Sequence, residues 1–215
     1  MLSSVEYGAF LAFSPRGTSE VSRRSQTITY RVKNDGPGPN EGESMIVAIA
    51  RRLRELLETS GLSHLLDQSV TFVPVPRAAP FPDPKSLWPA LRICEAFRGL
   101  EFGRDVLPCL KRVTAVRRSR FSPRGERPRP EEHMESMRVE LPLHAPEKIV
   151  LVDDVVTKGA TLLAAASLVK DTFPDADVRT FALIRTLGMI PEIDALIQPA
   201  VGSISDFYGE AHREP

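Results

Sequence analysis

The chain has 215 residues, which at about 150 residues per domain corresponds to one domain, with or without an appendage. Hydrophobic residues make up 42% and charged residues 26% of it, so a core can form without disulfides or metals. The 28 Lys and Arg residues balance the 28 Asp and Glu residues, which excludes a uniformly basic nucleic-acid coat protein. No stretch has the ~18 consecutive apolar residues of a membrane-spanning helix. We also expect no signal peptide, and therefore a cytoplasmic location.

The first 42 residues are expected to form a β-rich appendage. Polar and apolar side chains alternate from Gln26 to Val32, which predicts a strand with one wet face. Residues 7–13 are expected to pair with this strand in a hairpin. Two Gly-Pro pairs at 36–39 then mark a connector to the main body.

The rest of the chain alternates between helical and strand patterns, and Ser44 is placed to cap the first helix. In chain order, the predicted elements are a helix at 45–57, a strand at 70–75, a helix at 87–97, a strand at 148–152, a helix at 162–173 and a strand at 178–184. Strands that alternate with helices predict an α/β fold with a mainly parallel sheet flanked by helices. Ligands bind such sheets beyond the carboxyl ends of the strands, so functional residues are expected there.

The most informative segment runs from Ile149 to Thr161. A buried strand ends there in two carboxylates, Asp153 and Asp154, and a turn of small and hydroxyl-bearing residues leads into the next helix. Gly159 permits positive φ and a close approach of the backbone. The amides and dipole of a helix N-terminus suit a phosphate, whereas adjacent carboxylates suit sugar hydroxyls or a hydrated Mg²⁺. The segment therefore predicts a phosphorylated sugar across the turn; the alternative is a strand whose acidic end only caps the helix.

This segment resembles the phosphoribosyl pyrophosphate (PRPP) loop of type I phosphoribosyltransferases, and the chain looks most like their ComF-type branch. The shared pattern is an acidic pair, two apolar residues, Thr, any residue, Gly, a small residue and Thr, directly after an apolar strand. The resemblance implies a single phosphoribosyltransferase-like domain with a core at 70–185 and a smaller hood. It also implies that the acidic pair binds the ribose hydroxyls and that the turn holds the 5′-phosphate. These roles fall on Asp153, Asp154, Val155, Thr157, Lys158, Gly159, Ala160 and Thr161. Lys158 stands at the variable position and is expected to point to solvent.

A second stretch, Val73 to Ala78, ends a predicted strand where the family has its pyrophosphate loop. The resemblance assigns Arg77 as the anion ligand of this loop, with Ala78 beside it. The alternative is that Arg77 is an ordinary surface arginine.

A third stretch, at 111–129, carries eight basic residues against Glu126 alone, a local charge of +7. It lies where the family has a mobile loop that closes over PRPP. Lys111 and Arg112, at its start, are therefore expected to contact the pyrophosphate, whose charge a cationic lid would stabilise. The alternatives are a solvated loop and a nonspecific nucleic-acid contact.

Other candidates are weaker. His133 is expected to be a solvated loop residue, with a role as acceptor base as the alternative. Arg185 and Thr186 follow the last predicted strand. The sequence leaves two alternatives open, that they face the acceptor or that they point away from it. Cys94 and Cys109 form no CxxC pair and are expected to be reduced thiols or small core residues.

The resemblance implies a Mg²⁺-dependent phosphoribosyltransferase that transfers phosphoribosyl from PRPP to a nitrogen acceptor and releases pyrophosphate. Asp153, Asp154 and Arg77 would be its catalytic residues, and Mg²⁺ would be held mainly through PRPP rather than by protein ligands. The implied partners are PRPP and a small-molecule acceptor, no membrane is expected, and a homodimer is compatible with the chain. The alternatives are a non-catalytic PRPP- or nucleotide-binding protein with a regulatory or DNA-uptake role, and, less favoured, a nucleic-acid-binding protein.

Overall fold

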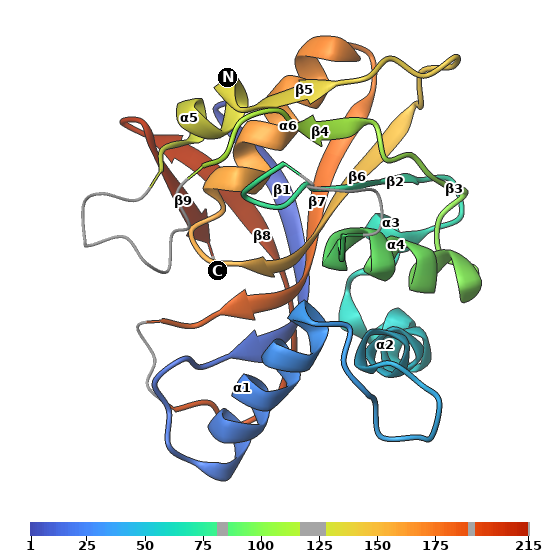
Figure 1. Ribbon diagram of the computed structural model, residues 1–215, viewed down its shortest axis with the longest axis vertical. Coiled ribbons are helices and arrows are strands. Elements are labelled where there is room, and N and C mark those ends of the chain that lie inside the picture. Colours follow the sequence, from blue (N-terminus) through green and yellow to red (C-terminus); the bar gives the residue numbers. More distant parts are fainter. Residues whose placement is uncertain (81–85, 117–127, 189–191, 215) are drawn as a thin grey trace.

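The computed structural model describes residues 1–80, 86–116, 128–188 and 192–214, and in these residues one seven-stranded sheet forms the centre of the fold (Figure 1). In spatial order the strands are β3 (Asp105–Val106), β2 (Thr71–Pro74), β6 (Lys148–Val156), β7 (Asp177–Thr186), β1 (Ser4–Phe13), β8 (Ile197–Phe207) and β9 (Glu210–Glu214). Neighbours from β3 to β1 are parallel, whereas β8 and β9 are antiparallel to theirs. The predicted α/β fold with a mainly parallel sheet flanked by helices is confirmed.

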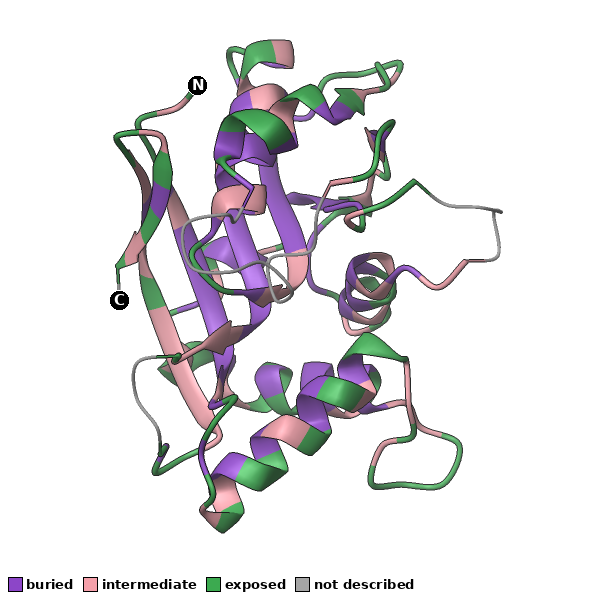
Figure 2. Cartoon of the chain, turned by 60° about the vertical axis from the view of Figure 1, so that its left-hand side comes forward, coloured by how far each residue is buried: buried purple, intermediate pink, exposed green. Residues whose placement is uncertain are grey.

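Helices cover both faces of this sheet. The helices α1 (Glu20–Lys33), α2 (Met45–Ser60), α3 (Ser63–Leu66) and α4 (Pro89–Gly99) pack on one face, and α6 (Ala160–Thr172) packs on the other. Along β6, Val150 and Val152 join the first hydrophobic cluster, whereas Ile149 and Leu151 join the second. Because side chains alternate across a strand, a strand covered on both faces is apolar throughout. Figure 2 shows the resulting layer of buried strands between helices.

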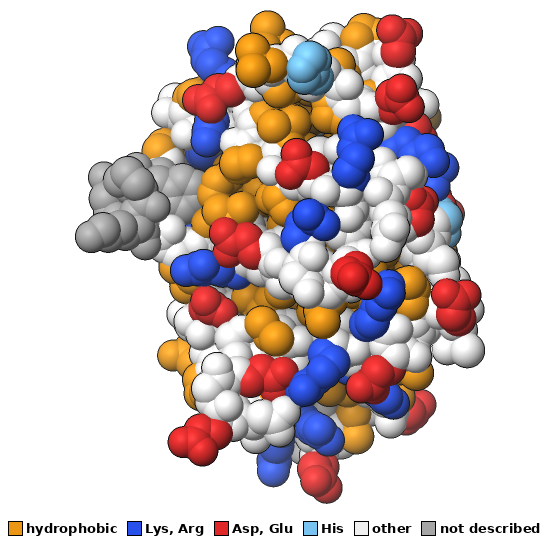
Figure 3. Space-filling view, turned by 90° about the vertical axis from the view of Figure 1, so that its right-hand side faces the viewer, with side chains coloured by type: hydrophobic (Ala, Val, Ile, Leu, Met, Phe, Trp, Pro, Cys, Tyr) orange, Lys and Arg blue, Asp and Glu red, His pale blue; other side chains and the backbone are white. Residues whose placement is uncertain are grey.

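The predicted helices and strands of the main body are confirmed within a few residues. The Ser44 side chain accepts a hydrogen bond from the amide of Val47 and so caps α2, as predicted. No helix in the described parts of the chain has the length and apolar character needed to cross a membrane. The face of the molecule that carries α2 and α4 shows basic and acidic side chains interspersed rather than gathered by sign (Figure 3).

The strand predicted from Gln26 to Val32 is wrong, because these residues lie inside α1. Ile28 and Val32 are one helical turn apart and face the core, while Tyr30 between them is 71% exposed. The pattern that reads as a strand therefore also places its two outer apolar residues on one face of a helix. Ser19 caps this helix through its side chain, which accepts from the amide of Ser22.

The predicted N-terminal hairpin is wrong as well. β1 lies between β7 and β8 in the main sheet, and its alternate side chains are buried under both helical layers. Residues 1–42 thus contribute an inner strand and a packed helix rather than a β-rich appendage.

A two-stranded antiparallel sheet, β4 (Leu110–Arg112) with β5 (Met137–Val139), stands apart from the main sheet. The short helix α5 (Pro130–Glu135) directly precedes β5. The basic stretch at 111–129 connects β4 to α5, and its residues 117–127 lie outside the described part of the chain.

Candidate functional site

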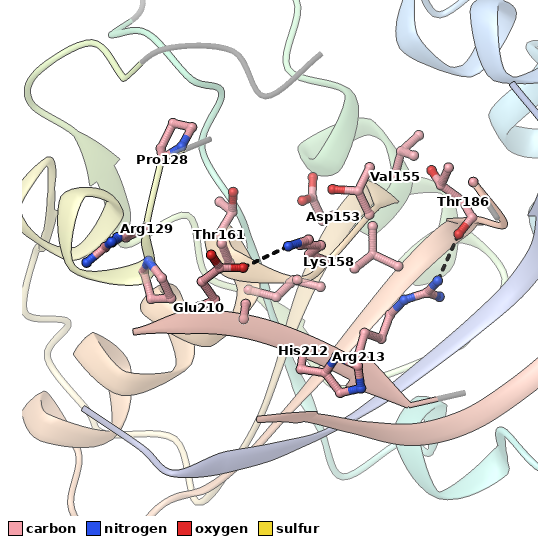
Figure 4. A pocket seen from close by; sticks show the side chains of 18 of the residues that line it. Pro128, Arg129, Asp153, Val155, Lys158, Thr161, Thr186, Glu210, His212 and Arg213 are labelled. Carbon is pink, nitrogen blue, oxygen red and sulfur yellow. Dashed lines mark hydrogen bonds and ion pairs between the residues drawn. The ribbon is translucent and has the colours of Figure 1, made fainter. Parts of the chain in front are cut away.

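A cavity of about 700 Å³ opens where β6 and β7 end (Figure 4). Its wall combines the end of β6 and the start of α6 with residues after β1, at the start of α5, at the end of β7 and in β9. The lining residues are Pro15, Arg16, Pro128, Arg129, Pro130, Asp153, Thr186, Gly188 and the ranges 155–162 and 210–213. Asp153, Val155, Thr157, Lys158, Gly159, Ala160 and Thr161, which the sequence singles out, thus share one cavity.

The turn from β6 to α6 places the first amides of the helix at the cavity wall. Gly159 is the N-cap of α6, with a left-handed φ of +94°, and no side chain caps this helix. Residues 160–162 line the cavity and carry the amides that a helix leaves without intrahelical partners. Amides of this kind, with the positive end of the helix dipole, form an anion site.

Gly159 is also required by packing. A Cβ atom on this residue would lie 2.7 Å from Cγ2 of Ile204, a buried residue of β8. A side chain here would therefore collide with the sheet rather than point into the cavity. A Gly159→Val variant would fail for this reason whether or not an anion binds to the turn.

The two carboxylates are strand residues, because β6 continues to Val156, and their side chains lie close enough to interact. Asp153 lines the cavity, whereas Asp154 is not part of its lining and forms an ion pair with Lys33 of α1, at 3.1 Å between Nζ and Oδ2. Burial, and next the negative charge of Asp154, raise the pKa of Asp153 well above its ordinary value. A group that donates hydrogen bonds or carries positive charge would stabilise this carboxylate.

Arg112 is buried in β4 and joins this strand to the loop after β2 and to α5. Its Nε donates to the carbonyl of Arg77 at 2.9 Å, and its NH1 donates to the carbonyl of His133 at 3.4 Å and to the Ser136 hydroxyl. Burial lowers its pKa to about 10, against the opposing effect of Asp153. Among the described residues its NH2 group has no hydrogen-bond partner. Arg112 therefore positions the loop after β2 against α5, instead of lying at the entrance of a solvated lid.

The other predicted pyrophosphate ligands lie outside the cavity lining. Arg77 is exposed, and its NH1 donates to the carbonyl of Leu87 at 3.0 Å. The carbonyl of Ala78 accepts from the amide of Val116 at 2.7 Å, which joins this loop to the start of the basic stretch. Lys111 Nζ lies 3.6 Å from a carboxylate oxygen of Glu140.

Lys158 is exposed, as predicted, and forms an ion pair across the cavity with Glu210 of β9, 2.9 Å away (Figure 4). The hydrogen bond from Lys158 lowers the pKa of Glu210. The pair connects the turn to a strand at the far end of the sequence, and it neutralises one positive and one negative charge of the cavity.

The favoured prediction for His133 is wrong, because this residue is buried in α5. Its Nε2 lies 3.5 Å from Oγ1 of Thr161, at the limit of a hydrogen bond. Burial and then Arg112 lower its pKa to about 4, although Glu132 acts in the opposite direction. His133 is therefore neutral at pH 7 and contacts the turn between β6 and α6 through Thr161.

Arg213, a cavity residue from β9, was not predicted from the sequence. Its NH2 donates to the carbonyl of Thr186 at 2.8 Å (Figure 4), and its NH1 donates to the hydroxyl of Tyr7 at 3.1 Å. Of the two candidates after the last predicted strand, Thr186 lines the cavity and Arg185 does not. No local pattern around Arg213 signals a site, since only the pairing of β8 with β1 and β9 brings it there.

The described residues contain no cluster of three or more His, Cys, Asp or Glu side chains that would hold a metal ion. Asp153 supplies a single carboxylate to the cavity, which fits a hard cation whose remaining ligands come from a bound phosphate compound and water.

A scan against models of known protein families found no match for the chain, and a search of curated proteins found no similar sequence.

Proposed function

We propose that this protein is a phosphoribosyltransferase of type I, similar to the ComF-type branch, that binds PRPP in the cavity after β6. The observation that carries the proposal is the uncapped N-terminus of α6 beside Asp153 in one cavity. A phosphorylated sugar needs both features at this spacing, an anion site and an adjacent acceptor of hydroxyl hydrogen bonds.

In this arrangement the 5′-phosphate binds to the amides of residues 160–162, and Thr157 and Thr161 add hydroxyl donors. Asp153 accepts hydrogen bonds from the ribose hydroxyls. Asp154, held by its ion pair with Lys33, ties the end of β6 to α1. The pyrophosphate extends toward the loop after β2, where Arg77 and the adjoining Arg112 provide positive charge.

The proposed reaction is displacement at C1 of the ribose. The lone pair of the acceptor nitrogen forms the new bond to C1, and the C1–O bond breaks. Pyrophosphate leaves with the bonding electrons, and an acceptor nitrogen that carried a proton passes it to water. Mg²⁺ bound to the pyrophosphate would neutralise part of the charge on this leaving group. The residues of the chain position the ribose and the anions and stabilise the charge that develops.

Calorimetry with PRPP and Mg²⁺ tests the binding step. We expect wild-type protein to bind PRPP, and Asp153→Asn to weaken binding about tenfold or more because a charged acceptor of the ribose hydroxyls is lost. Asp175→Asn, an exposed acid in the loop after α6, is the matched control and should bind like wild type. Unchanged PRPP affinity in Asp153→Asn would reject the assignment.

A pyrophosphate-release assay across nucleobases and amines tests turnover. Release with one acceptor supports the enzyme. Tight PRPP binding without release in any mixture would favour a non-catalytic PRPP-binding protein. Salt-sensitive DNA binding without PRPP binding would favour a nucleic-acid-binding protein.

A further inference from the structure

The cavity has a second cationic side, separate from the turn. Figure 4 shows Arg213 and Thr186 on the side away from Pro128, Arg129 and Thr161. Arg16, on the loop after β1, also lines the cavity. Thr186 ends β7, Arg16 follows β1 and Arg213 belongs to β9, so they lie across β6 from the loop that follows β2.

The guanidinium of Arg213 is fixed in place. Hydrogen bonds to the Thr186 carbonyl and the Tyr7 hydroxyl hold two of its nitrogens, and the group lies 5.5 Å from the centroid of the Tyr7 ring. Tyr7 is fully buried. A guanidinium held in this way needs little reordering when it binds a ligand.

The charge of Arg213 is not balanced by an acidic side chain in the described part of the protein. Among the described residues it forms no ion pair, unlike Lys158, which is neutralised by Glu210. Two polar atoms here, Arg213 Nε and Thr186 Oγ1, are buried and have no hydrogen-bond partner among the described residues. A partly buried cation and unpaired donors together are stabilised by an anion that accepts several hydrogen bonds.

We propose that Arg213 and Thr186 form a subsite for a carboxylate carried by the acceptor. This rests on the proposed function, because the subsite takes its meaning from PRPP bound at the turn. A nitrogen that displaces pyrophosphate approaches C1 from the face opposite the leaving oxygen. With pyrophosphate on the β2 side of β6, that approach comes from the side of β7 and β1, where Arg213 lies. The acceptor is thus a small nitrogen compound with a negative group, which the planar guanidinium binds through paired hydrogen bonds.

The same chemistry would suit a phosphate of PRPP itself, so the experiment separates the two sources. Calorimetry measures PRPP–Mg²⁺ on one arm. On the other arm it measures two matched pairs of probes, pyridine-3-carboxylate with its neutral amide and orotate with uracil, each with and without PRPP. The variants are Arg213→Gln, Thr186→Val, which keeps the side-chain shape, and Arg138→Gln as an exposed control.

We expect wild type to bind at least one acid of the panel about tenfold more tightly than its neutral partner. Arg213→Gln should abolish this preference and leave the PRPP affinity within about twofold, and Thr186→Val should reduce the preference partly. Because the Thr186 hydroxyl has no protein partner in the described residues, Thr186→Val should fold like wild type even if Arg213→Gln does not.

Equal binding of acid and neutral probes to wild type, or no binding of any acid, would overturn the subsite. A loss of PRPP affinity in Arg213→Gln that equals its loss of acid binding would assign the guanidinium to PRPP and overturn it too. Failure of wild type to bind PRPP refutes the proposed function instead. Arg213-dependent binding of the acids alone would then still support an anion subsite.

Discussion

Gly159→Ala should destabilise the protein through β8 rather than through the anion site. The new Cβ would lie 2.7, 2.8 and 2.9 Å from three side-chain carbons of Ile204. Overpacking of this kind costs about 1–3 kcal/mol. The left-handed φ of +94° adds about 1–2 kcal/mol for a residue other than glycine. The free energy of unfolding should therefore fall by about 2–5 kcal/mol.

A double-mutant cycle with Ile204→Ala isolates the packing part. The three contacting atoms are those that Ile204→Ala removes, and that change alone should cost about 2–5 kcal/mol because Ile204 is fully buried. In the double variant the collision disappears and only the backbone strain remains. The two effects should therefore combine to about 1–3 kcal/mol less than their sum.

Urea denaturation measures these free energies, and calorimetry with PRPP measures the site. Gly99→Ala is the control, since nothing lies within 4 Å of a Cβ there and its φ is not positive. The double variant should keep PRPP affinity, because the added methyl group points at β8 and leaves the amides of α6 open. Additivity within about 0.5 kcal/mol would refute the packing argument. Lost PRPP affinity in a folded double variant would show that the methyl group blocks the anion.

Three further predictions concern protonation and the corrected helix. The lowered pKa of His133, about 4, means that the folded state binds fewer protons than the unfolded state between pH 4 and about 6.5. Stability should therefore fall as pH drops through this window in wild type and fall less in His133→Gln, as followed by thermal unfolding. Hydrogen bonds from the amide of Thr18, and next from Ser19 and Ser22 at the start of α1, hold the pKa of Glu192 below its ordinary value. Their contribution is complete above about pH 4.5 and is lost as pH falls further, so the difference in melting temperature between wild type and Glu192→Gln should shrink in acid; a difference that grows there would contradict the assignment. Ile28→Asp should lower the free energy of unfolding by about 3 kcal/mol or more, because it buries an unpaired carboxylate. Tyr30→Asp, at an exposed position, should change the free energy of unfolding by no more than about 0.5 kcal/mol. Equal effects of the Ile28 and Tyr30 changes in urea denaturation would favour a strand there.

Local signals predicted the elements that depend on local residues. The apolar run of β6, the small turn residues and the stripe of α6 each have one reading, and the structure has all three in place. In α1 the same residues fit both the two-residue repeat of a strand and the 3.6-residue repeat of a helix. The contact of Ile28 and Val32 with distant core residues decided in favour of the helix. Propensity and pattern within seven residues cannot supply that information.

Only the part of the candidate site that the contiguous segment Ile149 to Thr161 builds could be predicted from the sequence. The strand was predicted to end at residue 152, before the acidic pair. β6 instead extends to Val156 and includes both acids, of which Asp153 lines the cavity and Asp154 pairs with Lys33. Arg213 and Thr186 meet through pairings across nearly the whole chain, and the carboxylate partners of Lys33 and Lys158 are likewise remote in sequence. Side chains that tertiary pairing brings together leave no spacing to recognise.

The place of β1 in the sheet has a consequence for how the protein forms. Glu6 on this strand and Thr180 on its parallel neighbour are joined by a hydrogen bond between residues 174 positions apart. Ribosomes add roughly 5–20 residues per second, so the partner strand is synthesised on the order of 10–35 s after β1. During that interval an apolar strand with two unpaired edges is exposed, which makes it prone to aggregation until its partner strands emerge. Contacts of such long range also slow the search for the native sheet, and folding in vitro should be slow for a chain of this size.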